Sequence, residues 1–110
     1  MKIGNLIKSM DYCWVVSDKK MKGSGLKKGD LVLVTGTKVA PISKIDPYLQ
    51  RIFVITVLVK DGEIRLPKSD NHYRAYLVDP RNLEKVDEDT QKWAEENLKK
   101  QYGNIPHYQI

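Results

Sequence analysis

The lysines and glycines between residues 19 and 30 are the group in this chain whose types and spacing best fit the binding of an anion. A glycine-rich backbone lets neighbouring cations adapt to an irregular row of phosphates, and each neutralised phosphate adds salt-dependent affinity. The alternative is a solvated connection whose lysines only maintain solubility. The Gly23-Ser24-Gly25 step is followed by a predicted strand, whereas a phosphate-binding loop needs a following helix. The lysines concerned are Lys19, Lys20, Lys22, Lys27 and Lys28.

Aromatic side chains provide a second kind of chemistry, because unpaired bases stack on aromatic rings. Tyr48 and Tyr73 lie in or beside predicted loops, so we expect both rings to be exposed. Tyr12 and Trp14 are two residues apart in a predicted strand and therefore share one face of it. For Trp14 we expect a position in the core.

Three arginines begin or occupy predicted strands, where a guanidinium group is held more rigidly than the ammonium group of a loop lysine. Arg51, Arg65 and Arg74 would then form a row that positions phosphates. The competing interpretation is that they belong to the polar outer face of an antiparallel sheet.

Residues typical of catalysis and metal binding are few. Cys13 stands between Tyr12 and Trp14 in an apolar strand, where a small buried thiol is expected. His72 and His107 lie far apart in polar or terminal segments, and only Asp70 is a close carboxylate for either of them. The sequence therefore predicts no enzyme, no metal site and no cofactor.

The charge of the chain is uneven. The 110 residues carry a formal net charge of +5 and a sequence pI near 9.3. Residues 1–86 hold sixteen basic and nine acidic side chains, a net charge of +7, whereas residues 87–110 hold three and five, a net charge of −2. An anionic partner is therefore expected to meet the first part of the chain and not its end.

Composition also bounds the class of protein. With 41% hydrophobic and 30% charged residues, a chain of 110 residues is expected to fold as one domain. One cysteine allows no internal disulfide, which favours a reducing, cytoplasmic location. The longest apolar run, residues 52–59, is far shorter than the roughly 20 residues of a membrane span, and no signal peptide is recognisable. We expect no membrane contact.

The elements that would position these residues are mostly strands. Asp61-Gly62 is a strong signal for a two-residue hairpin. Asp79-Pro80 predicts one tight helical turn, with Asp79 as its cap. Gly36 ends one strand, although residues 37–42 can extend the sheet as far as Pro41. Predicted strands lie at 12–16, 31–35, 51–60, 63–67, 73–78 and 84–86.

From residue 87 to residue 102 the pattern changes to that of an amphipathic helix. Acidic residues fill its first turn and lysines its last, and Gly103 follows as a stop. Its apolar stripe comprises Trp93, Ala94, Leu98 and Tyr102. Because an isolated helix of this length is marginal in water, we expect Trp93 and Leu98 to pack against the strands.

Two segments carry a resemblance to known small barrels. Residues 26–34 resemble the opening of KOW-type modules, and residues 76–86 resemble the turn and closing strand of Src-homology-type barrels. The resemblance covers residues 12–86. It implies a mainly β fold, a small antiparallel barrel of five to six strands in residues 1–86. The helix and tail of residues 87–110 are expected to pack on this barrel. Expected core residues are Val32, Val34, Phe53 or Val54, Ile55, Leu77 and Val86.

Two functions from different classes follow from these features. The first is a nucleic-acid-binding module, for RNA or a ribonucleoprotein before duplex DNA, because no helix is basic enough for a major groove. The second is a protein-interaction adaptor that uses a groove lined by Tyr and Trp or the stripe of the helix. A small regulator of a larger machine, as in phages and mobile elements, fits either class. The identity of the partner and the oligomeric state stay open.

Overall fold

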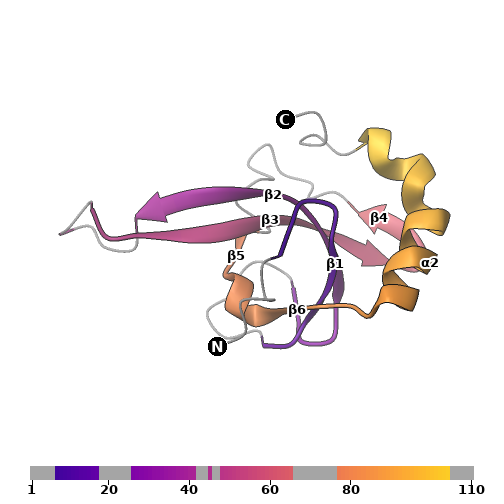
Figure 1. Ribbon diagram of the computed structural model, residues 1–110, viewed down its shortest axis with the longest axis horizontal. Helices are drawn as coiled ribbons and strands as arrows, with labels where there is room; N and C mark the ends of the chain where they lie inside the picture. Colours follow the sequence, from indigo (N-terminus) through magenta and orange to yellow (C-terminus); the bar gives the residue numbers. More distant parts are fainter. Residues whose placement is uncertain (1–6, 18–25, 42–44, 46–47, 66–76, 105–110) are drawn as a thin grey trace.

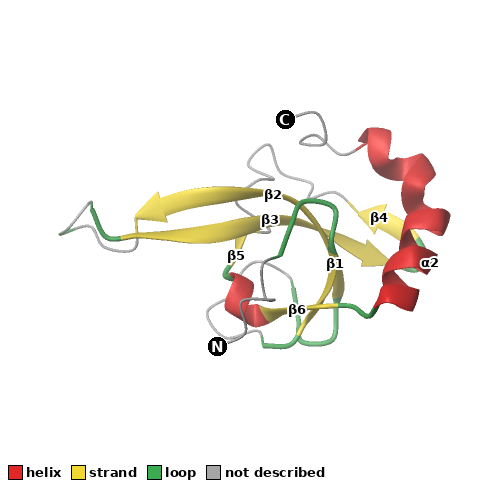
Figure 2. Cartoon of the chain, viewed as in Figure 1, coloured by secondary structure: helices red, strands yellow, loops and turns green. Residues whose placement is uncertain are grey.

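A computed structural model describes residues 7–17, 26–41, 45, 48–65 and 77–104, with residues 40, 41, 50, 51 and 104 described as backbone only. The described chain is mainly antiparallel sheet, followed by one α-helix (Figures 1 and 2). The strands are β1 (Tyr12–Val15), β2 (Leu31–Pro41), β3 (Gln50–Lys60), β4 (Glu63–Arg65), β5 (Leu77–Val78) and β6 (Leu83–Lys85). A 3-10 turn, η2 (Pro80–Asn82), precedes β6, and the chain continues into α2 (Glu88–Leu98) and η3 (Lys99–Asn104).

The strands form one sheet in the order β4-β3-β2-β1-β6, and β5 pairs with β3 at Val54 and Ile55. Within the described residues β4 and β6, the two ends of this path, are not paired with each other. The expected barrel is therefore not closed, although the mainly β, antiparallel architecture with a following helix is confirmed. The end strands have three residues each and β5 has two, so they offer few backbone groups for closing the sheet.

The hairpin of β2 and β3 is much longer than the other strands, and it extends beyond the body of the molecule (Figure 1). The register shifts between Val34 and Gly36, which marks a β-bulge; such an extra residue bends the strand locally. Pairing then continues to Pro41 and Gln50, so Gly36 does not end the strand. We call residues 37–41 and 50–53, with the connection between them, the β2–β3 arm.

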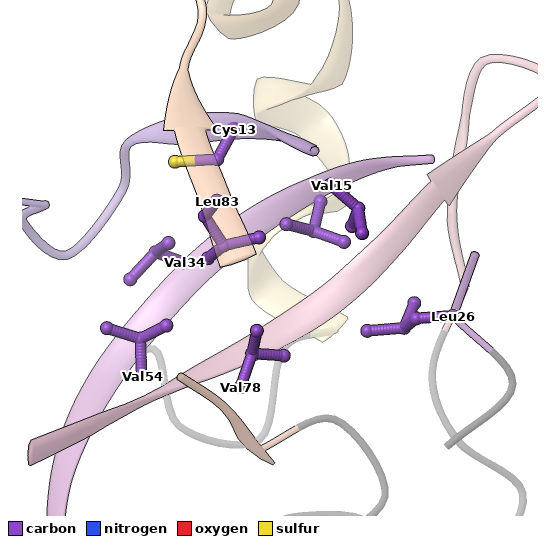
Figure 3. Close-up of a cluster of buried hydrophobic side chains, with 8 residues drawn as sticks. Cys13, Val15, Leu26, Val34, Val54, Val78 and Leu83 are labelled. Atoms are coloured by element: carbon purple, nitrogen blue, oxygen red, sulfur yellow. The ribbon is translucent and has the colours of Figure 1, made fainter. Parts of the chain in front are cut away.

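One face of the sheet holds an inner core, part of which is shown in Figure 3. Alternation along each strand selects its members, since successive side chains point to opposite faces. The core confirms Val32, Val34 and, of the two alternatives, Val54. Its buried residues are Cys13, Val15, Leu26, Val32, Val34, Val54, Val78 and Leu83.

The opposite face of the same strands is also buried, because α2 covers it. This second cluster contains the intervening residues of β1, β2 and β3, one residue between β6 and α2, and two residues of the helix: Tyr12, Leu33, Val57, Val59, Val86, Ala94 and Leu98. Val86 thus belongs to the core under the helix and not to a barrel interior. Ile55 and Leu77, also expected in the core, are only partly buried.

The helix packs through a different set of residues from the one expected. Leu98 is 1% exposed, as predicted, but Trp93 is 54% exposed, so the expected packing of Trp93 is wrong. Ala94 is fully buried in its place. At 3.6 residues per turn, Gln91, Ala94 and Leu98 share one side of a helix, whereas Trp93 lies about 100° from Ala94, on the side away from Leu98.

Two glutamine side chains fasten the helical segment to the sheet. The backbone N–H of Tyr12 donates to Oε1 of Gln91 (2.9 Å), and Nε2 of Gln91 donates to the carbonyl of Met10 (3.0 Å). Gln101 repeats the arrangement on β4, accepting from the N–H of Ile64 (2.8 Å) and donating to the carbonyl of Gly62 (3.2 Å). We call these pairs the glutamine clamps. Each clamp satisfies one backbone N–H and one backbone carbonyl, much as a neighbouring strand would.

Within the part of the chain that the structure describes, no helix combines the length and the apolar character needed to cross a membrane.

Candidate nucleic-acid interface

Lys27 and Lys28 are exposed and occupy a turn that leads into β2. The N–H of Lys27 donates to Oδ2 of Asp30 (2.8 Å), and the N–H of Asp30 donates back to the carbonyl of Lys27 (3.0 Å). Gly29 has φ +98°, a left-handed conformation that glycine adopts without strain. This local sequence therefore builds a defined turn at the end of the lysine-rich connection.

The turn is held against the end of β1. The N–H of Gly29 donates to the carbonyl of Val15 (2.7 Å), and the N–H of Val15 donates to the carbonyl of Asp30 (2.8 Å). Trp14 pairs with Leu31, the residue that follows the turn. Lys27 and Lys28 therefore lie at the same end of the β1–β2 pair as the indole of Trp14.

Trp14 is 41% exposed, so its expected place in the core is wrong. It shares a face with Tyr12, which is fully buried under the helix. The contacts of Gln91 reach Met10 and Tyr12, and Trp14 lies two residues further along the strand. Strand alternation correctly predicts that the two aromatic residues share one face. It does not predict how far along that face the helix extends, and therefore which of the two side chains is buried.

Val16 adds a second exposed apolar side chain, at 37%, beside Trp14. Its N–H donates to the carbonyl of Asn82 (2.9 Å), which brings the η2 turn alongside. There Arg81 forms an ion pair with Asp79 (2.9 Å), and that hydrogen bond raises the pKa of the guanidinium group. We call Trp14, Val16, Lys27 and Lys28 the Trp14 surface.

Charge around the Trp14 surface is mixed. Glu84 is the cross-strand partner of Trp14 on β6 and is exposed. Lys85, the next residue, forms an ion pair with Asp11 (3.4 Å). Lys27 and Lys28, the cations of the turn, are exposed, and the carboxylate of Glu84 bounds the surface on the β6 side.

The expected row of arginines is not assembled by the described residues. Arg65 pairs with Leu58 of β3, and Leu58 lies seven positions along that strand from Arg51. At about 3.3 Å per residue, these two positions on β3 are about 23 Å apart. Arg65 also forms ion pairs with Asp61 (3.5 Å) and Glu63 (3.9 Å), which compensate its charge. Arg51 is opposite Ala40 on the arm, and its side chain is not described.

The remaining predicted binding residues do not join the Trp14 surface. Tyr48 is 91% exposed, as predicted, but it lies in the connection of the β2–β3 arm, two residues before β3 begins. The other expected residues lie outside the described part of the chain, so their placement stays a prediction: Lys19, Lys20, Lys22, Tyr73 and Arg74.

The thiol of Cys13 is fully buried in the inner core. Burial, with a further contribution from the carboxylate of Asp11, raises its pKa to about 12. A thiol with this pKa is protonated at neutral pH and is a poor nucleophile. Among the described residues, no group of three or more His, Cys, Asp and Glu side chains is arranged to hold a metal ion.

Comparison of the chain with family models, with curated proteins and with solved structures gave no match. The resemblance of residues 12–86 to KOW-type and Src-homology-type barrels therefore has no support from relatives. What the surface can do has to be argued from its geometry.

Proposed function

We propose that this chain is a non-enzymatic protein that binds single-stranded nucleic acid, RNA before DNA, through the Trp14 surface. The observation that carries the proposal is the exposed indole of Trp14 at the end of the β1–β2 pair where Lys27 and Lys28 are exposed. An aromatic ring beside flexible cations is the combination that binds an unpaired strand, because the ring stacks on a base while the cations neutralise phosphates.

The free energy of base stacking favours a single-stranded ligand over a duplex. Stacking of one base on an aromatic ring contributes about 1–3 kcal/mol, whichever base is present. A duplex keeps its bases stacked on each other, and α2 cannot enter a major groove favourably. That helix carries Glu88, Asp89, Glu95 and Glu96 against Lys92 alone.

We further propose that residues 12–86 form an opened variant of the Src-homology-type barrel. Support comes from the long first connection, the long β2–β3 hairpin and the single 3-10 turn before the short last strand. The difference from a closed barrel is that β4 and β6, the two ends of the sheet, do not pair with each other within the described residues.

The two tryptophans provide a matched test, since both are exposed, at 41% and 54%, and they lie on different elements. The assay is the fluorescence anisotropy of a labelled, mixed-sequence, single-stranded RNA, titrated with protein at several salt concentrations. Trp14→Ala should weaken binding at least fivefold, the equivalent of about 1 kcal/mol. Trp93→Ala should leave the affinity unchanged.

Lysine substitution tests the electrostatic half of the proposal. Replacing Lys27 and Lys28 with Gln should weaken binding and reduce the salt slope by about 1.4, at about 0.7 per phosphate contact on a single strand. Equal losses from Trp14→Ala and Trp93→Ala would contradict the proposal, as would the absence of RNA binding by the wild-type protein at low salt.

A second function, that of a protein-interaction adaptor, is favoured by Trp93 alone. The stripe of α2 is unavailable to a partner because Ala94 and Leu98 are buried against the sheet. Trp93 instead points away from the sheet on a helix with three more acidic than basic side chains, which suits a basic protein segment. Titration with a lysine-rich amphipathic peptide should then change the fluorescence of a Trp14→Phe protein, and Trp93→Ala should abolish binding.

A further inference from the structure

Trp14 has two different neighbours across the strands of the sheet. On β2 it pairs with Leu31, a partly buried residue that packs against the core under the helix. On β6 it pairs with Glu84, which is exposed. Directly opposite residues on antiparallel strands share one face, with their Cβ atoms about 4.5–5.5 Å apart. The exposed indole is therefore bordered by an apolar side chain on one side and by a carboxylate on the other.

The carboxylate of Glu84 is not compensated by the protein. Within the part of the chain that the structure describes, Glu84 forms no ion pair and no side-chain hydrogen bond. Both of its acceptor oxygens are therefore available to a ligand on the Trp14 surface. The carboxylates of the adjoining segments are each bonded within the protein: Asp11 to Lys85, Asp79 to Arg81 and Asp30 to the N–H of Lys27.

A carboxylate in this position lowers the affinity for a strand of phosphates, because the two negative charges repel each other. A surface that binds only the phosphate backbone gains nothing from it. A surface that recognises a base does gain, because a carboxylate accepts strong, charge-assisted hydrogen bonds from donors on the edge of the base. The position of Glu84 beside the exposed ring thus favours recognition of a base that carries such donors.

The Watson–Crick edges of the four bases differ in what they offer to a carboxylate. These edges are accessible when an unpaired base stacks on an aromatic side chain. Guanine presents two adjacent donors, N1–H and the N2 amino group, which match the two oxygens of a carboxylate. Adenine and cytosine present one amino group beside an acceptor nitrogen, and uracil presents one N–H between two carbonyl oxygens. Because an acceptor on the base repels the carboxylate, guanine is the base that forms a bidentate pair with it.

We infer that a guanine base of the bound strand stacks on Trp14 and donates two hydrogen bonds, from N1–H and from the N2 amino group, to the carboxylate of Glu84. This inference rests on the proposed binding of single-stranded nucleic acid and adds the base that the surface prefers. Lys27 and Lys28, at the end of the β1–β2 pair, bind phosphates, whereas Glu84, on the β6 side, binds the edge of the base. The cations and the carboxylate then have separate roles around one ring.

Base preference is measured by the fluorescence anisotropy of labelled uridine oligonucleotides in which only the central base varies. The wild-type protein should bind the oligonucleotide with guanine about fivefold or more tightly than those with adenine, cytosine or uracil. Glu84→Gln should lose this preference and bind the other three at least as tightly as wild type, because it no longer repels phosphates. Glu96→Gln, the control, makes the same change in net charge at an exposed position of α2 and should keep the preference.

Base analogues identify the edge that the protein contacts. Inosine in place of guanine lacks the N2 amino group, so it should bind wild type about threefold or more weakly, the effect of one hydrogen bond. Glu84→Gln should bind the guanine and inosine oligonucleotides equally. 7-Deazaguanine keeps both donors of the Watson–Crick edge and lacks only the N7 acceptor, so it should bind wild type as guanine does. A loss with 7-deazaguanine as large as the loss with inosine would overturn the inference.

Two further outcomes separate this inference from the proposed function. If Trp14→Ala weakens RNA binding but wild type binds the four oligonucleotides equally, the role of Glu84 is refuted and the proposed function stands. A guanine preference that survives Glu84→Gln has the same meaning. Absence of binding to every oligonucleotide refutes both. Because Glu84 is exposed, Glu84→Gln should melt within a few degrees of wild type, and circular dichroism checks this.

Discussion

Replacing Gln91 with Ala should destabilise the fold far more than its place near the start of a polar helix suggests. The change removes the bond from the N–H of Tyr12 (2.9 Å) and the bond to the carbonyl of Met10 (3.0 Å). Each intramolecular hydrogen bond contributes a net ~0.5–1.5 kcal/mol, so the loss is about 1–3 kcal/mol. Tyr12 is fully buried, which limits the access of water to its backbone in the variant.

That loss corresponds to a measurable shift in the melting temperature. An unfolding entropy of about 2.1 cal/mol/K per residue predicts a decrease of about 4–13 °C for a chain of this length. Thermal and urea unfolding followed by circular dichroism measure it. Lys92→Ala, at the neighbouring exposed position, is the control and should stay within about 0.5 kcal/mol of wild type. If Gln91→Ala unfolds with the same midpoint as Lys92→Ala, the clamp has no energetic role and the reasoning fails.

Three further predictions concern packing, charge and reactivity. Leu98→Ala should cost about 2–5 kcal/mol in urea unfolding because the side chain is 1% exposed, whereas Trp93→Ala should stay near wild type; similar costs for both would show that the helix packs differently. Cys13 should resist a thiol reagent at neutral pH until the protein unfolds, because burial raises its pKa to about 12; rapid labelling of the folded protein would contradict its burial. The last change replaces five lysines together with Gln: Lys19, Lys20, Lys22, Lys27 and Lys28. Anisotropy titrations should then show weaker RNA binding and a flatter salt dependence, while thermal unfolding should give an unchanged melting temperature. An unchanged salt slope would exclude this loop from binding.

Local features of the fold were predictable from the sequence wherever one short segment determines its own geometry. Asp61 and Gly62 both have positive φ, at 55° and 73°, as a tight hairpin turn with these residues requires. Asp79 caps the η2 turn by accepting from the N–H of Arg81 (2.9 Å), and Pro80 follows it as expected. Asp87 caps α2 in the same way, through the N–H of Thr90 (2.7 Å).

The candidate site was less predictable because exposure depends on residues distant in the sequence. Tyr12 and Trp14 have the same alternation and similar character, yet α2 covers one and not the other. Trp93 fits an apolar stripe with Ala94, but which side of the helix meets the sheet is defined by long-range contacts, those of Gln91 with β1 and of Leu98 with the core. No pattern within a single segment contains that information.

The face of the sheet that α2 covers stays exposed while the chain is being synthesised, until the helix has been made. Leu33, Val57 and Val59 are buried by a helix that is translated after every strand of the sheet. At about 5–20 residues per second, the ribosome needs roughly 2–8 s to proceed from Lys60 to Tyr102. During that interval a nascent chain can pair β2 with β3 but leaves one apolar face of the hairpin open. Chaperone binding to the nascent protein should therefore peak in this window and end when the helical segment emerges.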